Sequence, residues 1–502
     1  MNNLILFEDD HLLVANKPAG VNTHKPDRFT PDGLHEWLTK RETRWAKLSV
    51  LHRLDKETSG VIVFGKTTLA NQSLSKQFES HRVEKLYFML SDRRPKRVKF
   101  FVRNQRTKTG GEQTDFELLA EAGDFWLVAA RPLTGKTHQI RRHASENHFA
   151  IAGDTKYGGV PAGRLMLHAR SISFEHPATG ERVTFSSSVP EAFENPDVLV
   201  AAKEACDLIF DESTTGFRLL NGVDVIVDSY AGNLLVQWQT EEALAGAKEF
   251  YRRLETICRS VAVYEQLVTR QKRTAPQLVA GTAVAQRFAM LENGLTYLVN
   301  FGEGFSAGIF LDQRENRRRL LRMPLAGKTV LNCFAYTCGF SVAAAKAGAA
   351  TTSVDLSKNY LEWGKENFRA NGLEADRHDF IFGDVFDWLQ RFGKRGATWD
   401  LVMLDPPTFS TSKKGMGRAF QAERDYRELA AKAAALVKKG GTLFCSTNQR
   451  TFHADLFEEA IKSGVRDAGR SVEGMEFETL LWDFPVAEKE KPYLKTFWVR
   501  LD

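Results

Sequence analysis

A carboxylate that could take part in catalysis lies near the start of the chain, where residues 52–60 read HRLDKETSG. Asp55 follows Arg53 closely, and a carboxylate held next to a guanidinium stays ionised. An ionised carboxylate in a loop can act as a nucleophile or as a base. The same residues could form a structural ion pair, so the segment by itself leaves both interpretations open.

Further carboxylates occur in the second half of the chain, each after an apolar run that is expected to be a strand. They are Asp355, Asp384 and Asp405, and the last of them begins the segment DPPTF. A carboxylate at a strand end can hold two ribose hydroxyls of a cofactor. Each could equally cap the next helix, but their joint occurrence with a proline pair favours a cofactor site.

The elements that must position Asp55 are short. Segments rich in branched and aromatic residues, among them 60–64, 86–90 and 125–130, recur between turn signals. They predict an α+β domain over residues 1–200 with a mixed, largely antiparallel sheet. Residues 201–295 are expected to be a linker and a small α/β intermediate domain with an amphipathic helix over 241–256.

Strands and helices alternate over residues 296–502, which predicts a doubly wound α/β domain of Rossmann-like type. The expected strands are 330–334, 351–355, 380–382, 401–404 and 442–446. A helix is expected over 423–438 and should end at Gly440 and Gly441. Since ligands of such sheets bind at the carboxyl ends of the strands, the three carboxylates should meet there.

The bulk composition is that of a globular protein, with 502 residues, 43% hydrophobic and 26% charged. No apolar run approaches the ~20 residues that span a bilayer, and no signal peptide is visible, so a cytoplasmic protein without a membrane partner is expected. Five scattered cysteines without a CxxC pair argue against disulfides and against a metal site. Basic residues cluster at 93–108 and 317–322, where they could neutralise phosphates or form solvated faces.

Four segments carry a family resemblance through their order: KPAG at 17–20, HRLD at 52–55, EKLY at 84–87 and TGKTHQIRRH at 134–143. With GD at 153–154, YG at 157–158 and LHA at 167–169, residues 4–190 closely resemble the RluA-type pseudouridine synthases. The resemblance implies that Asp55 is the catalytic nucleophile, which lets uracil detach from its ribose and rejoin through carbon without a cofactor. The uridine must first be flipped out of its helix.

The same resemblance assigns further site residues. Tyr87 would stack on the uracil, Arg141 would pair with the catalytic aspartate, and Arg53 would fill the space of the extruded nucleotide. Lys136 stands where the family more often has arginine, which keeps the charge but loses the bidentate fork, and it is expected with His138 to contact the substrate.

A second resemblance covers residues 216–502, which are similar to class I S-adenosylmethionine methyltransferases of the large-subunit ribosomal RNA group, including LDQR at 311–314. It implies S-adenosylmethionine as cofactor and RNA, in particular large-subunit ribosomal RNA, as partner. The residues that it assigns are Asp355 for the ribose, Asp384 for the adenine edge, Tyr336 and Gly339 for the methionine part, Asp405 beside the cofactor, and Asp405 with Pro406 and Pro407 for the target base. Cys338 stands where the family usually has glycine, so its side chain could crowd the cofactor.

The atom that is methylated depends on a thiol. Methylation of cytosine C5 requires a cysteine thiolate to add to C6, whereas guanine N7 needs only its lone pair. The cysteine position of the carbon-methylating relatives is Asn448 here, and Cys445 lies in an apolar run that favours a buried structural thiol.

Two further segments bear on this choice. DPPTFS with SK at 412–413 and STNQRTF at 446–452, where Asn448 would position the guanine edge, resemble the guanine-N7 methyltransferase half of a bacterial fusion. The intermediate segment and residues 493–497 look more like the cytosine branch.

The sequence therefore predicts a bifunctional RNA-modifying enzyme. It would isomerise uridine to pseudouridine and methylate a base of large-subunit ribosomal RNA, with guanine N7 favoured and cytosine C5 as the alternative. A competing interpretation is a ribosome-assembly factor that binds RNA through both folds and has one silent catalytic centre.

Overall fold

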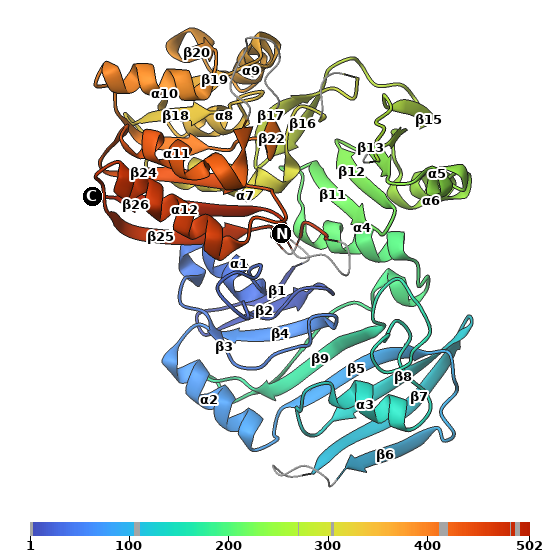
Figure 1. Ribbon diagram of the computed structural model, residues 1–502. Helices are drawn as coiled ribbons and strands as arrows, with labels where there is room; N and C mark the ends of the chain where they lie inside the picture. The colour runs from blue at the N-terminus through green and yellow to red at the C-terminus, as the bar shows by residue number, and fades with distance from the viewer. Residues whose placement is uncertain are drawn as a thin grey trace. The chain divides into compact units, whose positions relative to one another are not determined.

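The chain folds as two compact units in a computed structural model that describes residues 4–104, 111–269, 271–302, 306–410, 420–481, 483–486 and 492–502 (Figure 1). The first unit contains most residues up to 211, and the second contains most residues from 212 onward. Among the described helices, none is long and apolar enough to cross a membrane. The three-domain division at residues 200 and 295 stays a prediction.

Ten strands of the described part of the first unit form one sheet, with β1-β2-β4-β9-β5-β8-β7-β6 in order, β3 beside β4 and β10 beside β9. Their bounds are β1 (Ile5–Glu8), β2 (Leu12–Lys17), β3 (Ser49–Val50), β4 (Ser59–Gly65), β5 (Glu84–Ser91), β6 (Lys99–Asn104), β7 (Glu112–Ala122), β8 (Phe125–Pro132), β9 (Leu167–Glu175) and β10 (Arg182–Ser186). Only the β4–β9 pairing among these described strands is parallel. The predicted mixed, largely antiparallel sheet is confirmed.

Helices α1 (Leu34–Arg41), α2 (Thr68–Glu79), α3 (Gln139–Glu146) and α4 (Val198–Ile209) accompany this sheet. Helix α2 packs against β4 and β9, and α3 packs against β7 and β8. Every residue of β4 is buried, as its apolar sequence SGVIVFG requires. The loop that carries Asp55 joins β3 to β4, so this buried strand holds it in place.

Gly60 is the second residue of β4 and lies where β4 meets β9. Its φ is +112°, and a Cβ atom there would lie 2.2 Å from the carbonyl oxygen of Ala169. Only glycine combines this backbone conformation with this close approach. Gly60 therefore fixes the end of the loop that carries Asp55 against β9.

We expect Gly60→Ala to lower the free energy of unfolding by about 2–4 kcal/mol, because it adds backbone strain to a steric clash. Thermal or denaturant unfolding of the purified protein measures the change. Gly123→Ala is the matched control, since Gly123 has φ +58° with open space around it, and it should cost only about 1 kcal/mol. Equal losses in the two variants would contradict the role given to the close approach.

The second unit begins with a five-stranded sheet in the order β11-β12-β13-β14-β15. Its elements are β11 (Gly216–Asn221), β12 (Val225–Tyr230), β13 (Asn233–Trp238), α5 (Glu241–Ala245), α6 (Lys248–Cys258), β14 (Ala262–Leu267) and β15 (Gln277–Gly281), followed by the hairpin β16 (Phe288–Glu292) and β17 (Leu295–Val299). The single helix predicted over 241–256 is wrong, because α5 ends at Gly246 and α6 starts anew.

The rest of the second unit is a seven-stranded sheet in the order β20-β19-β18-β21-β24-β26-β25. The strands are β18 (Thr329–Cys333), β19 (Ala350–Asp355), β20 (Asp379–Phe382), β21 (Trp399–Leu404), β24 (Val437–Thr447), β25 (Val472–Thr479) and β26 (Lys495–Leu501), and a two-stranded ribbon β22 (Phe409–Ser410) and β23 (Phe420–Gln421) stands apart. The first five are parallel, and β26 is antiparallel to its neighbours. The predicted doubly wound α/β fold is confirmed.

Helices cover both faces of this sheet, and each face has its own core. The helices are α7 (Arg314–Arg322), α8 (Gly339–Lys346) and α9 (Lys358–Ala370), with α10 (Val385–Lys394), α11 (Ala422–Ala434) and α12 (Ala454–Asp467). The first three contribute to one core and the last three to the other. The order in which successive strands are added to the sheet reverses between β18 and β21, which is where such folds place their ligand.

The helix predicted over 423–438 is too long, because α11 ends at Ala434 and β24 already begins at Val437. Gly440 has φ +70°, and the β21–β24 register shifts between the Val437 and Thr442 pairs. The glycine pair therefore makes an irregularity inside the strand, where a helix end was expected.

Candidate active sites

Asp55 lies at a cavity of about 430 Å³ in the first unit, which is also lined by Arg53, Tyr87, Lys136, His138 and Arg141. The segments 51–58, 78–87 and 132–141, which are far apart in the sequence, meet here. All six residues that the resemblance assigned to this half thus border one cavity. Their roles stay predictions.

Arg141 is the nearest cation to Asp55. Its Nη1 lies 3.8 Å from Oδ2 of Asp55, and its Nε and Nη2 donate to both oxygens of Asp154 at 2.7 and 2.8 Å. The bidentate pair fixes the guanidinium, because a buried fork held by one carboxylate has little freedom. Arg141 therefore presents a fixed positive charge to Asp55, while Arg53 is exposed and donates to the Thr137 hydroxyl at 3.4 Å.

The backbone on both sides of Asp55 is clamped by the KPAG segment and the residues after it. The Lys17 ammonium donates to the carbonyl oxygens of Pro18, Val21 and Lys56 at 2.9, 2.7 and 3.1 Å. The Thr23 hydroxyl accepts from the Leu54 N–H and donates to the Leu54 carbonyl, both at 3.1 Å. The residues before and after Asp55 are thus each held by a buried side chain.

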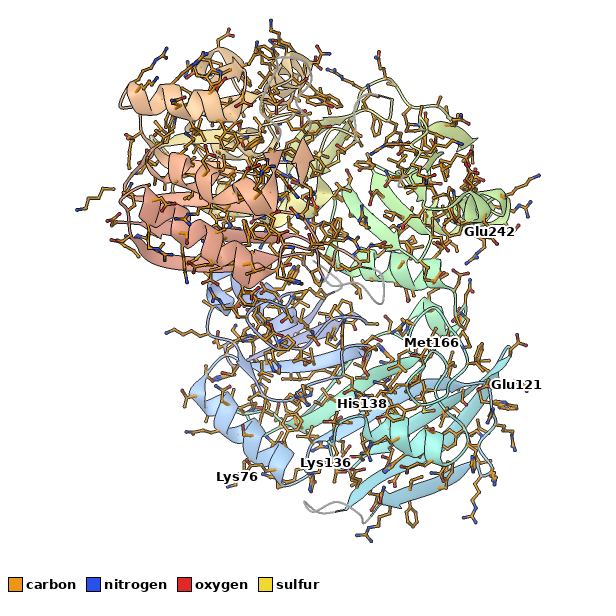
Figure 2. The ribbon with its side chains drawn as sticks, viewed as in Figure 1. Lys76, Glu121, Lys136, His138, Met166 and Glu242 are labelled. Atoms are coloured by element: carbon orange, nitrogen blue, oxygen red, sulfur yellow. The ribbon has the colours of Figure 1, made fainter. Side chains whose placement is uncertain are left out.

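We expect Lys17→Met to destabilise the first unit by about 3 kcal/mol and to slow isomerisation at least tenfold. The substitution leaves three carbonyl oxygens without their donor, and each buried unsatisfied group costs about 1–3 kcal/mol. Burial lowers the pKa of Lys17 to about 7, so the charge of the Lys17 side chain depends on the residues around it. Unfolding curves and single-turnover assays below the melting temperature measure both effects, and exposed Lys76→Met on α2 should change neither (Figure 2).

Tyr87 and His138 face Asp55 from two different elements. Burial and the Asp55 charge raise the pKa of Tyr87, so its hydroxyl keeps its proton. His138 precedes α3 with φ +55°, its Nε2 lies 3.9 Å from Oδ2 of Asp55, and its Nδ1 bonds to the Tyr157 hydroxyl at 3.0 Å. Burial lowers the pKa of His138. Figure 2 shows that Lys136 and His138 both lie close to the N-terminal end of α3.

The second candidate site is built at the carboxyl ends of β18, β19, β20 and β21. The loop after β18 is strained, with φ of +62° at Phe334, +50° at Tyr336 and +62° at Cys338. The Tyr336 N–H donates to Oδ2 of Asp355 at 2.8 Å, and the Ser357 N–H donates to Oδ1 at the same distance. Positive φ values in residues other than glycine persist where surrounding contacts force them, commonly at ligand sites.

Aromatic contacts fix the Tyr336 side chain. Its ring packs against Tyr360 at 4.5 Å between centroids, and its hydroxyl bonds to Ser306 at 2.9 Å. Gly339 starts α8, and its carbonyl accepts from the Tyr297 hydroxyl at 3.1 Å. The residues assigned to the methionine part of the cofactor therefore belong to one rigid turn.

The surroundings of Asp355 suit a nucleoside. Asp355 is paired with Phe382 across β19 and β20, and the side chains of Leu356 and Phe382 are 42% and 41% exposed. Two exposed apolar side chains beside a fixed carboxylate fit an adenine ring with its ribose. Burial raises the pKa of Asp355. Asp384 caps α10, since its Oδ1 accepts from the Asp387 N–H at 3.2 Å.

Asp405 is held by the LDQR segment. The Gln313 amide donates to Oδ1 of Asp405 at 3.1 Å and to the Ser446 hydroxyl at 2.8 Å. Burial raises the pKa of Asp405 to about 6. Pro406 is buried behind it and Pro407 is exposed. LDQR thus ties the ends of β21 and β24 together, a function that its sequence alone did not indicate.

Cys338 contacts one of the residues assigned to the cofactor, since its Sγ donates to the Tyr336 carbonyl oxygen at 3.8 Å. Its side chain is fully buried and packs on Gly364 of α9, where an added Cβ would lie 2.4 Å from Sγ. Gly364 supplies the room that a cysteine needs at this position. The crowding of the cofactor by Cys338 stays a prediction.

Asn448 and Cys445 differ in their surroundings. Asn448 is exposed after β24, and its Oδ1 accepts from the Thr408 hydroxyl. Cys445 is fully buried in β24, and burial raises the pKa of its thiol. The predicted burial of the Cys445 thiol is confirmed. Residues 412–413 of the expected guanine motif and 105–108 of the first basic cluster lie outside the described residues.

Sequence reasoning missed several residues that hold these sites. Asp154 and Lys17 stood in quoted motifs without a role, and Thr23 had no signal. Lys495 donates to the carbonyl oxygens of Gln449 and Tyr493 at 2.9 and 2.8 Å and so fixes the loop that carries Asn448. In the described ranges, no group of His, Cys, Asp and Glu is arranged to hold a metal ion.

Two family models match the chain. The S-adenosylmethionine-dependent methyltransferase model covers residues 223–484, and the RNA pseudouridylate synthase model covers residues 11–146. A solved structure described as a methyltransferase complexed with SAH has a TM-score of 0.56 and 28% identity, and it covers 65% of this chain and 86% of that chain.

Two curated relatives are similar to parts of the chain. Ribosomal RNA large subunit methyltransferase I of Shewanella amazonensis is 33% identical over 393 residues, covering 74% of this chain and 92% of that protein. Ribosomal RNA large subunit methyltransferase K of Neisseria meningitidis serogroup B is 42% identical over 169 residues, covering 34% of this chain and 47% of that protein.

Proposed function

Because this chain belongs to the S-adenosylmethionine-dependent methyltransferases, we propose that its second unit methylates guanine N7 and its first unit forms pseudouridine, both in large-subunit ribosomal RNA. The chain is an enzyme with both kinds of domain, and its methyl donor is S-adenosylmethionine. The bases and the residue roles are the proposal.

In the first unit, Asp55 is the nucleophile. Its carboxylate attacks C1′ of the ribose as the bond from C1′ to uracil N1 breaks. The uracil then turns, its C5 displaces the carboxylate from C1′, and the C5 proton leaves to solvent while N1 is protonated. Arg141 places its fixed positive charge beside the carboxylate, and Tyr87 stacks on the uracil with its hydroxyl protonated. Arg53, which is exposed, fills the gap that the flipped nucleotide leaves.

The choice of guanine as the target base rests on the burial of the cysteines. All five cysteines are described, four are buried, and Cys258 is partly exposed but lies near the end of α6. Addition to C6 of cytosine needs a reactive thiolate at the target base, and buried thiols with raised pKa do not provide one. Guanine N7 carries no proton, so its methylation needs neither a thiol nor a base.

Asn448 is suited to a guanine edge. Its oxygen is taken by Thr408, which leaves its amide N–H groups as donors, and the O6 atom beside guanine N7 is an acceptor. The similarity to ribosomal RNA large subunit methyltransferases K and I supports large-subunit ribosomal RNA as the substrate. Cytosine C5 remains the second candidate, because the intermediate segment and residues 493–497 look more like the cytosine branch.

We expect Asp355→Asn to weaken binding of S-adenosylmethionine by about 10–100-fold, since a hydrogen bond to a charged group contributes about 1.5–3 kcal/mol. Isothermal titration calorimetry measures the affinity. Asp376→Asn removes an exposed carboxylate on the same unit, before β20, and should leave the affinity unchanged. Unaltered binding in Asp355→Asn would remove this residue from the cofactor site.

The proposal as a whole is tested by nucleoside mass spectrometry mapped to position. Large-subunit ribosomal RNA from a strain without this protein should lack one or more pseudouridines and one 7-methylguanosine, and the purified enzyme with S-adenosylmethionine should restore both. Restoration of 5-methylcytosine would establish the second candidate. RNA that keeps all of these modifications in the deletion strain would refute both.

A further inference from the structure

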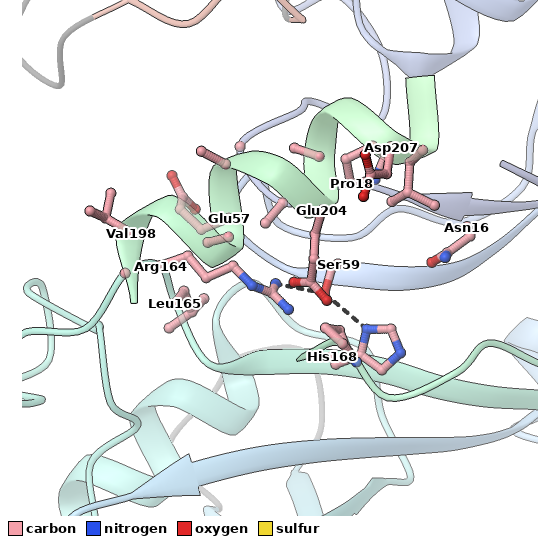
Figure 3. Close-up of a pocket in the computed structure, with 18 of the residues that line it drawn as sticks. Asn16, Pro18, Glu57, Ser59, Arg164, Leu165, His168, Val198, Glu204 and Asp207 are labelled. Atoms are coloured by element: carbon pink, nitrogen blue, oxygen red, sulfur yellow. Dashed lines mark hydrogen bonds between the residues drawn. The ribbon is translucent and has the colours of Figure 1, made fainter. Parts of the chain in front are cut away.

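The first unit has a second cavity of about 450 Å³ that no step of the proposed reactions uses (Figure 3). Ser59 and His168, which pair across β4 and β9, line it, whereas their neighbours Thr58 and Leu167 line the cavity of Asp55. Successive residues of a strand point to opposite faces. The two cavities therefore lie on opposite sides of the same strand pair.

The walls of this cavity are mostly small and apolar. Helix α4 forms one wall, as Figure 3 shows, with Val198, Ala201, Ala202 and Ala205 among the lining residues. Pro18 of the KPAG segment and Leu165 also line it. A cavity of this size and lining is typical of a site for a small organic ligand.

Two charged side chains that are only partly exposed, Arg164 and Glu204, line the cavity. The Arg164 guanidinium donates to Ser59 Oγ at 2.8 Å, and the Glu204 carboxylate accepts from the backbone N–H groups of Glu191 and Ala192. Among the ion pairs of the described residues, none joins Arg164 to Glu204. Burial lowers the pKa of Arg164 to about 10 and raises that of Glu204.

The direction of Arg164 is fixed by a chain of hydrogen bonds. Ser59 Oγ bonds to Nδ1 of His168 at 2.9 Å, and Nε2 of His168 bonds to Ser187 Oγ at 2.8 Å. Burial lowers the pKa of His168 to about 3, so the ring is neutral and passes one hydrogen bond along. The remaining N–H groups of Arg164 are accordingly presented to the cavity as a fixed set of donors.

The charges around the cavity exclude simple ions as its ligand. Glu57 and Asp207 also line it, so with Glu204 three carboxylates oppose the entry of a phosphate. A cation would meet the guanidinium of Arg164. The chemistry instead fits a neutral, flat group whose edge has acceptors beside donors, because such an edge satisfies Arg164 and Glu204 together.

We propose that this cavity binds a guanine base, with O6 and N7 toward Arg164 and with N1–H and the N2 amino group toward Glu204. Arginine pairs well with O6 and N7, and a carboxylate accepts from N–H donors. The apolar walls then contact the faces of the ring, as in other pockets for extruded bases. The identity of the ligand rests on the proposed action on RNA, and the guanine comes either from that RNA or from a free nucleotide.

Calorimetric titration of the full-length protein with guanosine and with adenosine tests the proposal. Guanosine should bind at least about tenfold more tightly than adenosine, whose amino group would point its donors at Arg164. Arg164→Met should abolish guanosine binding, and so should Ala205→Phe, which fills the cavity and leaves its charges intact. Arg82→Met, at an exposed arginine of the same unit, is the matched control and should bind as the unaltered protein does.

The source of the guanine is distinguished with ribosomal RNA transcribed with 6-thioguanosine. Crosslinking to α4 that Ala205→Phe prevents would mean that the RNA supplies the base, and guanosine binding without this crosslink would mean a free nucleotide. Absent guanosine binding, equal affinity for adenosine, or unchanged binding in Ala205→Phe would overturn the proposal. None of these readouts requires isomerisation, so loss of pseudouridine formation with intact guanosine binding would count against the proposed function alone.

Discussion

Asp55→Asn should abolish pseudouridine formation, with a loss of about 10⁴-fold or more, and should leave methyl transfer unchanged. An amide of the same shape keeps the fold but cannot attack the uridine, and removal of a nucleophile has effects of this size. Asp55 belongs to the first unit, and the residues assigned to methyl transfer belong to the second. Both products are measured in one reaction by nucleoside mass spectrometry of a ribosomal RNA transcript.

Glu79→Gln is the control for this variant, because Glu79 is a second carboxylate that lines the same cavity. It should lose less than about tenfold in isomerisation, since no reacting atom is assigned to it. Loss of both activities in a folded Asp55→Asn protein would contradict the model of two independent sites. Retained isomerisation in Asp55→Asn would remove Asp55 as the nucleophile.

Asn448→Ala should lower methylation by about 10–100-fold, whereas Cys445→Ala should leave it unchanged. The first variant removes the donors assigned to guanine O6 and leaves that acceptor without a partner in the bound state, at a cost of about 1–3 kcal/mol. The second removes a buried sulfur from β24 and should cost only about 1 kcal/mol of stability. Methyl transfer from labelled S-adenosylmethionine to ribosomal RNA measures the first effect, and thermal unfolding the second.

Cys333→Ala is the matched control, since Cys333 is another fully buried cysteine, in β18. It should resemble Cys445→Ala in both stability and methylation. The opposite pattern, with methylation lost in Cys445→Ala and kept in Asn448→Ala, would establish cytosine chemistry. A covalent complex with RNA containing 5-fluorocytidine would point the same way, because only thiolate addition to C6 can trap it.

Much of the first site could be predicted because its motifs are local. HRLD, EKLY and the segment around Arg141 each place a reactive side chain by a few residues of sequence, and all border one cavity. The bidentate pairing of Arg141 with Asp154 and the clamp of Lys17 on Lys56 join residues that are 13 and 39 positions apart. No periodicity or propensity encodes such partners, because any loop carbonyl can accept from a buried lysine.

Element ends were less predictable for the same reason. Gly440 and Gly441 resemble a helix end, yet the register between β21 and β24 makes them an irregularity within a strand. A glycine permits a positive φ in either setting, and only the neighbouring strand selects one of them.

By itself the sequence determined that two catalytic domains of different chemistry share this chain, and it supplied the carboxylates to which both candidate sites are assigned. The tertiary structure decided what surrounds them. It turned Cys338 toward Gly364, buried Cys445, fixed Arg141 between two carboxylates and brought Arg164 and Glu204 to the lining of one cavity. These outcomes depend on packing between segments distant in sequence, and packing sets burial, which in turn sets the charge and reactivity of each group.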